Sequence, residues 1–244
     1  MKTLSKFMIV IAVSLSACKK DNSSTNNTPA AKTYLLSKIT YHNPTYIGVE
    51  QYSYDEKNRV TEVYSTESNW DYKYTYDTNG NLLTATTYNI NNSSLLLIHT
   101  DKYTYSGTRV TVQKFDKDGT DLGSYIFTLN SDGQAVSSTI DGTTTYTYDA
   151  NKNLSGYSTC CSIAQSDSYS YDTKKHPLSM IAGNNLHLRF LALASPTALI
   201  NNITRDNAWG ANISYVYNSD GFPVSATMVS VGTPVTLEYE YSVK

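Results

Sequence analysis

The sequence is poor in cysteine, in charged residues and in long apolar runs. Of its 244 residues only three are cysteine, two are tryptophan and four are histidine, and 16% are charged, for a formal net charge of −2. No block of basic residues is present that could bind the phosphates of a nucleic acid, so nucleic acid is excluded as a partner. Beyond the N-terminal segment, no stretch is long and apolar enough for a transmembrane helix, which needs about 20 residues.

The sequence also lacks the local motifs of common catalytic and cofactor sites. It has no HExxH pair, no Gly-x-Ser-x-Gly elbow and no glycine-rich phosphate loop, and its histidines are scattered. Most carboxylates fall in turn sequences, where Asp already bonds to the backbone. We therefore expect a protein that is not an enzyme and needs no cofactor. A pair of glycosidase carboxylates leaves no local motif, so a glycan-active hydrolase remains an alternative.

The first 17 residues have the pattern of a secretory signal. A short basic start precedes an uncharged, largely apolar run at residues 7–15, which is too short to cross a bilayer as a helix. Residues 15–18, Leu-Ser-Ala-Cys, resemble the lipobox of bacterial lipoproteins. The resemblance implies cleavage before Cys18 and attachment of lipid to its thiol, and several acyl chains on one residue give a stable membrane anchor. An ordinary signal with a chance cysteine is the alternative.

Residues 18–33 form a polar stretch after the signal. They are rich in Asn, Ser and Thr and cannot bury apolar area, so we expect the lipidated Cys18 to begin a disordered tether. The opening Cys-Lys-Lys-Asp resembles many lipoproteins of the Bacteroidota, in which charged residues after the cysteine can direct the protein to the cell surface. Only one acidic residue follows the lysines, so this resemblance is partial. We expect a lipid-anchored outer-membrane protein and leave open whether it faces the periplasm or the cell surface.

Tyrosine is the abundant aromatic residue, with 22 copies against five of phenylalanine. It recurs in a Tyr-x-Tyr element that predicts a strand with both rings on one face. The steps between successive elements are 22, 29, 22, 21, 23, 46 and 24 residues. We interpret the step of 46 as two periods with one drifted unit between them. The elements begin at Tyr52, Tyr74, Tyr103, Tyr125, Tyr146, Tyr169, Tyr215 and Tyr239.

Each Tyr-x-Tyr element is followed by turn-forming residues and then by an apolar residue. Asp or Asn in the turn can accept hydrogen bonds from the backbone ahead, and Gly supplies a positive φ. One repeat is therefore predicted to be one antiparallel β-hairpin. Val60 and Val63 are three residues apart, so either a bulge lies there or both sheet faces are partly covered. The expected second strands open at Val60, Leu82, Val110, Val136, Leu154, Leu178 and Val224.

Residues 74–82, YTYDTNGNL, resemble the YD repeat of Rhs proteins and teneurins. The resemblance covers nearly all of residues 34–241, and its spacing is more similar to short YD-repeat lipoproteins of the Bacteroidota, an uncharacterised group. The arginines usual in Rhs units are mostly missing, although Arg59 and Arg109 fit their slot, and no toxin segment or cleavage motif follows the array. The resemblance implies stacked hairpins in an extended, twisted sheet, and it does not imply toxin delivery.

Residues 34–244 are thus predicted to be an all-β domain of repeated antiparallel hairpins with a period of about 21–24 residues. Its ends are complementary: residues 34–39 resemble a second strand without a first, and residues 237–241 a first strand without a second. Pairing of these half-repeats would close the twisted or curled sheet and remove its edges. An open spiral that starts and stops within a repeat is the alternative.

Residues 177–212 diverge from the repeat. Their centre, residues 186–200, is the most apolar part of the mature chain. It is either a cap that packs over one sheet face, as repeat arrays require, or a hydrophobic patch that binds a partner. We favour the cap.

Two groups of residues are weak candidates for binding sites. Asp116, Asp118 and Asp121 alternate around a glycine as calcium ligands do, but no Glu closes the loop, and an ordinary repeat turn is the alternative. Trp70 and Trp209, together with the tyrosines, could stack on sugar rings. Rows of tyrosine on a sheet are nevertheless first of all cross-strand packing pairs.

Cys160 and Cys161 are adjacent in the sequence. An exported protein meets an oxidising compartment, so a vicinal disulfide is conceivable. Such a bond would strain the intervening peptide, and we expect two thiols or an intermolecular bond more readily.

We expect a non-enzymatic, membrane-anchored lipoprotein that has a binding or structural role, with a glycan or a protein as its ligand. An envelope assembly or docking component is a second interpretation. An outer-membrane barrel is disfavoured because a lipid anchor would be redundant, and strands of roughly seven residues are shorter than the nine to eleven that span a bilayer.

Overall fold

The computed structural model describes most of the chain after residue 31. The signal segment, Cys18, the tether up to residue 31, and Cys161 lie outside the described residues. The barrel belongs to the compact unit Lys32–Lys244. No helix in the described part is long and apolar enough to cross a membrane. The described residues are 32–92, 94–140, 142–160, 165–181, 188, 200–230 and 234–244.

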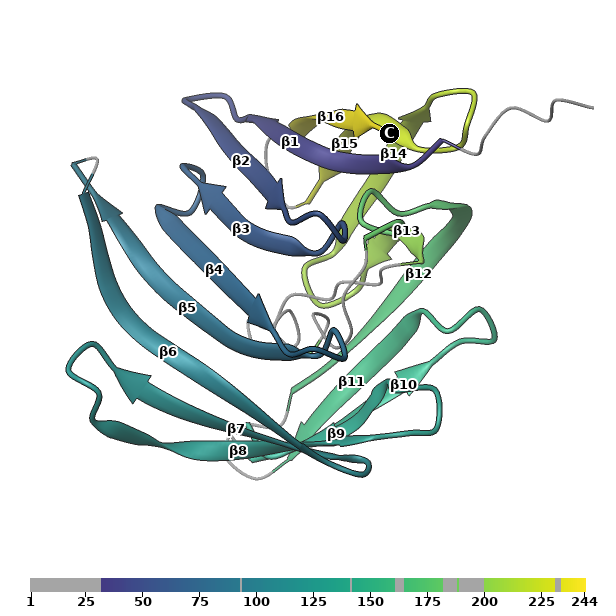
Figure 1. Ribbon diagram of the computed structural model, residues 1–244. Helices are drawn as coiled ribbons and strands as arrows, with labels where there is room; N and C mark the ends of the chain where they lie inside the picture. The colour runs from purple at the N-terminus through teal and green to yellow at the C-terminus, as the bar shows by residue number, and fades with distance from the viewer. Residues whose placement is uncertain are drawn as a thin grey trace, which may run out of the picture. The chain divides into compact units, whose positions relative to one another are not determined.

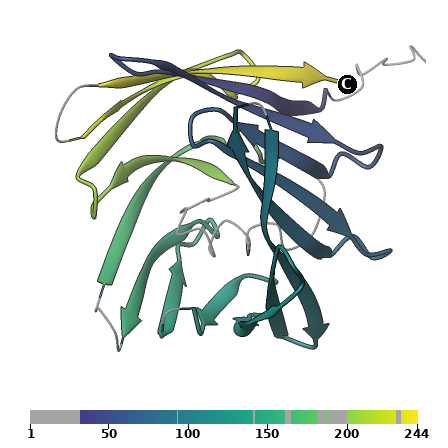
Figure 2. The same ribbon diagram turned by 90° about the vertical axis from the view of Figure 1, so that its left-hand side faces the viewer.

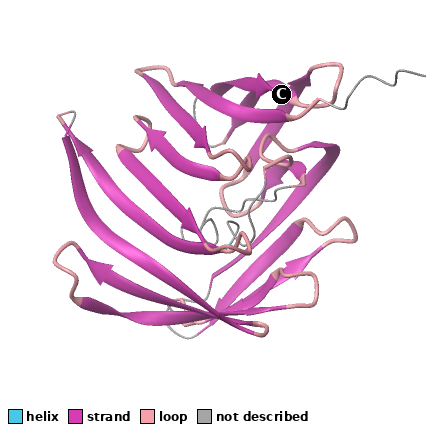
Figure 3. Cartoon of the chain, viewed as in Figure 1, coloured by secondary structure: helices cyan, strands magenta, loops and turns pink. Residues whose placement is uncertain are grey.

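Sixteen antiparallel strands in the described part of the chain form one closed barrel around an interior (Figures 1, 2 and 3). Each strand is hydrogen-bonded to its neighbours in chain order. The predicted all-β class of repeated hairpins is confirmed. The strands are β1 (Tyr34–His42), β2 (Ile47–Tyr54), β3 (Val60–Ser65), β4 (Trp70–Tyr76), β5 (Leu82–Asn91), β6 (Ser94–Ser106), β7 (Arg109–Asp116), β8 (Asp121–Leu129), β9 (Ala135–Ser138), β10 (Thr143–Tyr148), β11 (Leu154–Cys160), β12 (Gln165–Lys175), β13 (Asn201–Asp206), β14 (Ala211–Tyr217), β15 (Pro223–Val229) and β16 (Val235–Val243).

The two terminal half-repeats close the barrel. Strand β1 pairs with β16 from Tyr34 opposite Val243 to His42 opposite Thr236. Just outside these strands, Thr33 and Lys244 exchange two backbone hydrogen bonds of 2.9 and 3.0 Å. The sheet therefore has no free edge, and the open spiral is excluded. The chain enters and leaves the barrel at the same end.

Within the described barrel wall, the step of 46 residues contains one hairpin and not two. Strand β12 pairs directly with β13, with Tyr169 opposite Asp206, so no additional hairpin of the wall separates Tyr169 from Tyr215. The extra length lies in the turn between β12 and β13. The interpretation of a drifted unit is therefore wrong, and the difference is a long insertion inside one turn.

The geometry of the other turns identifies where this insertion begins and ends. In an ordinary turn, the Oδ1 atom of Asp77 accepts hydrogen bonds from the backbone N–H groups two and four residues on, at 2.8 and 2.9 Å. Asp172 accepts from Lys174 at 2.9 Å and then from Asn202, thirty residues away, at 3.1 Å. The Asn202 amide also donates to the Asp172 carboxylate, as Asn81 does to Asp77. Residues 173–201 thus replace three residues of a standard turn.

A β-bulge follows the turn in several hairpins. Ser53 lies opposite Glu62 but Tyr54 lies opposite Val60, so one extra residue is accommodated and both Val60 and Val63 are buried inside the barrel. The bulge interpretation is confirmed. Four predicted strand openings were wrong. Arg109, Ala135 and Pro223 open β7, β9 and β15 in place of Val110, Val136 and Val224, while Leu178 lies in the connection after β12.

The bulges leave backbone carbonyl groups free, and tyrosine hydroxyls bind them. The second tyrosine of most repeats donates its hydroxyl proton to the carbonyl oxygen at or near the start of the second strand in the preceding hairpin. This pattern explains why tyrosine, and not phenylalanine, dominates the repeat. The pairs are Tyr54 to Leu36, Tyr76 to Val60, Tyr105 to Leu82, Tyr148 to Ala135, Tyr171 to Leu154 and Tyr241 to Pro223, at 2.5–2.8 Å.

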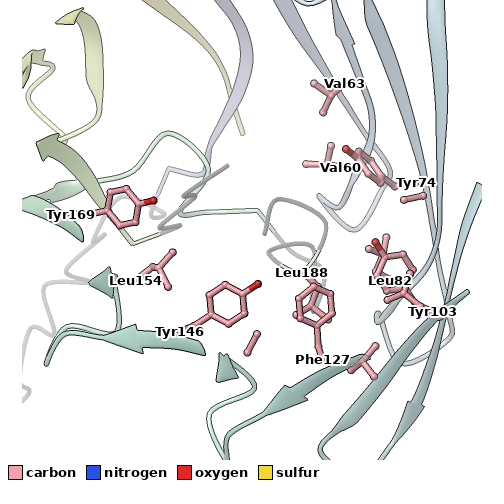
Figure 4. Close-up of a cluster of buried hydrophobic side chains, with 14 residues drawn as sticks. Val60, Val63, Tyr74, Leu82, Tyr103, Phe127, Tyr146, Leu154, Tyr169 and Leu188 are labelled. Carbon is pink, nitrogen blue, oxygen red and sulfur yellow. The ribbon is translucent and has the colours of Figure 1, made fainter. Parts of the chain in front are cut away.

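The interior of the barrel is packed with apolar and tyrosine side chains. One cluster extends from Val60 and Tyr74 to Tyr169, and Leu188 packs within it (Figure 4). A smaller cluster contains Leu36, Ile39 and Leu178. Leu178 and Leu188 of the insertion therefore pack inside the barrel, and Leu188 is fully buried. The remaining residues of the segment 186–200, apart from Ile200, lie outside the described residues.

Part of the outer face of the barrel wall is polar. Glu62, Lys73, Thr86 and Thr100 lie opposite one another across β3 to β6, on the face away from the core. Lys73 forms an ion pair of 3.1 Å with Glu62. On the other side of the closure, Lys38 and Glu240 pair at 2.8 Å. These hydroxyl and charged residues share the outer face with isolated apolar residues such as Leu83 and Val216.

Candidate ligand-binding cavity

The packed interior leaves one sizeable cavity of about 410 Å³ among the described residues. Its wall is mainly aromatic and aliphatic, with four polar residues, Glu50, Ser68, His176 and Asn202. It extends from the insertion, which begins and ends at the same end of the barrel as Thr33 and Lys244, to the β3–β4 connection at the opposite end. The tyrosines that line it are Tyr41, Tyr52, Tyr72, Tyr74, Tyr215 and Tyr239.

Strand alternation and cross-strand pairing position the wall of the cavity. On β2, Glu50 and Tyr52 lie on the same face as Tyr54, because side chains two residues apart point the same way. Ile39 lies directly opposite Glu50 on β1 and is buried in the core, so Glu50 also points inward. The repeat that places tyrosines inside the barrel therefore also places this carboxyl group inside.

The insertion contributes the polar and apolar residues on one side of the cavity. His176, Pro177 and Leu178 form a tight turn directly after β12, and all three line the cavity. The His176 Nδ1 atom accepts a hydrogen bond of 3.1 Å from the Leu178 backbone N–H, so the neutral ring carries its proton on Nε2. Burial lowers the pKa of His176 to about 4. The ring is therefore uncharged at neutral pH.

Glu50 is the carboxyl group of the cavity wall. Burial raises its pKa, a hydrogen bond from the Tyr52 hydroxyl to Glu50 Oε1 lowers it, and the nearby charge of Glu67 raises it further. Burial also raises the pKa of Tyr41 and Tyr239, and the charge of Glu50 adds to both increases. These phenols are therefore neutral hydrogen-bonding groups beside the carboxyl group.

A second carboxylate lies at the β3–β4 connection. Glu67 accepts hydrogen bonds from the Tyr46 hydroxyl at 2.6 Å and from the Asn43 side-chain amide at 3.3 Å. Its side chain occupies the space above Gly48, where a Cβ atom would overlap it. Gly48 thus lets the Glu67 carboxylate fold back against β2. Two acidic groups, and no lysine or arginine, are placed at or near the described wall of the cavity.

The three aspartates of the calcium candidate are occupied by turn contacts. Asp116 Oδ1 accepts the backbone N–H groups of Asp118 and Thr120 at 2.9 and 2.7 Å. Asp118 forms an ion pair with Lys117, and Asp121 accepts the Gly123 N–H at 2.7 Å. Within the described ranges, no group of three or more His, Cys, Asp or Glu residues is arranged to hold a metal ion.

The two tryptophans do not form one site. Trp70 begins β4 and is half-buried, while Trp209 lies in the β13–β14 turn with 75% of its surface exposed. The rings of the Tyr-x-Tyr elements pack against the interior core.

Cys160 is disulfide-bonded. The expectation of a free thiol at this position is therefore not met. Neither of the other two cysteines of the chain, Cys18 and Cys161, lies among the described residues.

The cavity residues were missed in the sequence because each has an unremarkable local context. Glu50 is a single acidic residue in a strand, and His176 is one of four scattered histidines. One signal was available: Glu50 lies on the same strand face as Tyr52 and Tyr54. A charged residue is rare on a buried face, so its presence there indicates a pairing partner or a function. The residues that surround Glu50 come from β1, β2 and β16, and their proximity could not be predicted from their spacing in the sequence.

The fold and the site define a closed, antiparallel barrel with a filled interior and a small tyrosine-lined cavity. No protein-family model matches the chain, and no curated protein sequence matches it. The family resemblance of residues 74–82 therefore remains a prediction.

Among solved structures, the chain is similar to porin-like proteins from two Bacteroides species. The first, from Bacteroides uniformis, is 12% identical over 86% of this chain and 99% of its own, with a TM-score of 0.39. The second, from Bacteroides vulgatus, is 11% identical over the same shares, with a TM-score of 0.43. A chain in the TcdB2–TccC3–Cdc42 structure is 14% identical over 81% of this chain and 10% of its own, with a TM-score of 0.22. Likenesses this distant do not extend to function.

Proposed function

We propose that this chain is a non-enzymatic binding protein of the outer membrane, tethered by lipid on Cys18, that holds a small molecule inside its barrel. The observation that carries the proposal is the interior cavity of about 410 Å³. Small-molecule sites are enclosed, mostly apolar spaces with a few placed polar groups, of about 300–1,000 Å³. The described interior is otherwise packed with Tyr, Val and Leu side chains, and this cavity has the size and the lining of such a site.

The polar outer wall supports a barrel that stands in water beside the membrane. A barrel embedded in lipid presents an apolar band about 25 Å tall and keeps polar residues inside. A lysine near the middle of such a band costs about 2–4 kcal/mol. Here Lys38 and Lys73 lie on the outer wall, each paired with a glutamate, while the interior is packed mainly with aliphatic and tyrosine side chains. This arrangement favours a lipid tether over insertion as the mode of attachment.

The test is ligand binding that depends on the cavity. We would screen the purified full-length chain in non-ionic detergent against neutral, anionic and cationic small molecules by thermal shift, and confirm hits by calorimetry. Val63 lines the cavity and is buried, so Val63→Phe should fill part of the space and abolish binding. Thr86→Phe, on the outer wall, is the matched control and should bind normally. Absence of any ligand, or full binding by Val63→Phe, would refute the proposal.

A docking role is the second candidate, favoured by the tip of the β5–β6 hairpin. Leu95, Leu96 and Ile98 are 41%, 48% and 40% exposed there. The β6 residues before His99 pair with β5 but not with β7, so this tip extends beyond its neighbour. A photo-crosslinking residue at position 96 should capture an envelope protein in cells, whereas the same residue at position 86 should not. Equal capture at both positions would exclude a specific docking site.

A further inference from the structure

The Glu50 carboxyl group faces the cavity without a cationic partner in the described structure. Its hydrogen-bond donor is the neutral Tyr52 hydroxyl on the same strand. The ion pairs of the described chain lie elsewhere, as between Arg59 and Asp55 in a turn or Lys38 and Glu240 on the outer wall. Buried carboxylates are normally paired or metal-bound, because an isolated charge in an apolar interior is costly. Among the described residues, Glu50 is thus an acidic group without a cationic counter-charge.

Aromatic rings surround this carboxyl group. Tyr41, Tyr52 and Tyr239 come from three neighbouring strands, and all three line the same cavity as Glu50. The electrostatic influence of Glu50 on Tyr41, Tyr52 and Tyr239 indicates that their rings lie close to it. The cavity therefore combines one acidic group with several electron-rich ring faces.

This combination selects for positive charge. Aromatic faces attract an ammonium or quaternary ammonium group, and enclosure by several rings strengthens the attraction because water is excluded. Glu67 adds a second acidic group near the β3–β4 side of the cavity. An anionic ligand would meet both carboxylates and no lysine or arginine of the described wall. A neutral ligand would leave the Glu50 charge unpaired when the group is ionised.

We infer that the cavity binds a small organic cation, an amine or quaternary ammonium compound, with Glu50 as its charge partner and the tyrosine rings as its walls. This inference rests on the proposed ligand-binding function and specifies the class of ligand. The volume of about 410 Å³ is near the lower end of the range for small-molecule sites, so the ligand is small. No covalent step is involved.

The probes for the test are choline and its uncharged isostere 3,3-dimethylbutan-1-ol. They have the same shape, so a difference between them measures the contribution of charge. Calorimetry on the purified full-length chain in non-ionic detergent should give an affinity for choline at least about tenfold higher, which corresponds to about 1.4 kcal/mol. Equal affinity for the two probes would overturn the inference and leave the proposed function standing.

Two carboxylate variants separate a local role of Glu50 from a general effect of charge. Glu50→Gln keeps the size of the side chain and should lower the choline affinity at least about tenfold, without changing that for the alcohol. Glu62→Gln removes an acidic group from the outer wall on the adjacent strand and should change neither affinity. Unchanged choline binding in Glu50→Gln would overturn the inference.

The two failures are distinguishable. If anionic or neutral molecules bind and Val63→Phe abolishes that binding, the cavity is a ligand site but not for cations. If no probe of any charge binds, both the inference and the proposed function are refuted. Glu50→Gln should unfold in a single cooperative transition, as the unsubstituted chain does. This control would establish that a loss of binding is not a loss of folding.

Discussion

At the scale of single residues, the second tyrosine of most repeats is both a core residue and a hydrogen-bond donor. Its ring packs inside the barrel, and its hydroxyl binds a carbonyl group that the β-bulge has freed. Tyr76, for example, donates to the Val60 carbonyl at 2.7 Å, and Val60 is fully buried. A buried carbonyl group without a donor would cost about 1–3 kcal/mol.

Replacing one such tyrosine tests this role. Tyr76→Phe keeps the ring, so the packing and the contact with Arg59 remain, but the Val60 carbonyl group loses its donor. We expect a loss of about 1–2 kcal/mol in the free energy of unfolding, measured by denaturant titration. Tyr64→Phe is the control, because Tyr64 faces the outer wall of the barrel. Equal effects of the two substitutions would contradict the proposed contribution of the hydroxyl.

Glu50 is expected to reduce the stability of the folded protein at neutral pH. Its pKa is raised above the usual value of about 4.5, so the folded state holds the proton more tightly than the unfolded state. The stabilisation is present below the unfolded-state pKa and is lost as pH rises through the folded-state pKa. Each unit of increase corresponds to about 1.4 kcal/mol. The groups facing Glu50 are Tyr41, Tyr52, Tyr239 and Glu67, and substitution of Glu50 leaves them in place.

The measurement is the free energy of unfolding as a function of pH in the absence of ligand. Glu50→Gln should be more stable than the unsubstituted chain at pH 8 and similar to it at pH 4, because the amide does not ionise. His176 titrates near pH 4 in both proteins, so its contribution cancels. If Glu50→Gln is less stable than the unsubstituted chain at pH 8, then ionised Glu50 does not lower the stability of the folded protein, and this prediction is wrong.

At the scale of elements, the hairpin repeat was predictable because its signals are local. Tyr-x-Tyr, an Asp or Asn five residues before the second strand, and a residue of positive φ such as Gly80 all act within a few residues. The insertion was misread because its two ends are joined by a contact between Asp172 and Asn202. These two residues are thirty positions apart, and a contact over that separation leaves no periodic pattern in the sequence.

Shortening the insertion tests its contribution to the interior. Replacing residues 173–201 with Thr-Asn-Gly, the sequence of residues 78–80, would join Asp172 to Asn202 through a standard turn. The hairpin should still form, but the interior would lose the buried Leu178 and Leu188, at about 2–5 kcal/mol for a large core side chain. We expect retained strand content by circular dichroism, lower stability and stronger binding of a hydrophobic dye. Unchanged stability would show that the insertion does not support the core.

At the scale of the whole molecule, closure removes the sheet edges that would otherwise pair with other chains. It depends on β1 and β16, whose residues are about two hundred positions apart in the sequence. The first and last residues of the barrel segment meet there, since Thr33 and Lys244 are hydrogen-bonded to each other. Closure also encloses the cavity, because β1, β2 and β16 supply the residues around Glu50.

Truncation and permutation should therefore have opposite effects. Removing residues 235–244 deletes β16 and exposes the edges of β1 and β15, so we expect oligomers or aggregates by light scattering. A circular permutant in which Lys244 is joined to Thr33 by a short linker and the chain is opened between Asn79 and Gly80 keeps all sixteen strands described here. It should remain monomeric. A monomeric truncated chain would show that closure is not needed to protect the edges.

The sequence by itself determined the strand class, the hairpin repeat, the turns and the common face of the two tyrosines in each element, because these depend on alternation and on contacts between near neighbours. It also left two options for the ends, and pairing of the half-repeats was one of them. Only the tertiary structure decided that the tyrosine face points inward, that the barrel closes, that Leu178 and Leu188 of the insertion pack inside, and that Glu50 meets Tyr41 and Tyr239 around a cavity. These features depend on pairing between distant residues and on the volume that a closed wall encloses, and neither quantity is a property of any local segment.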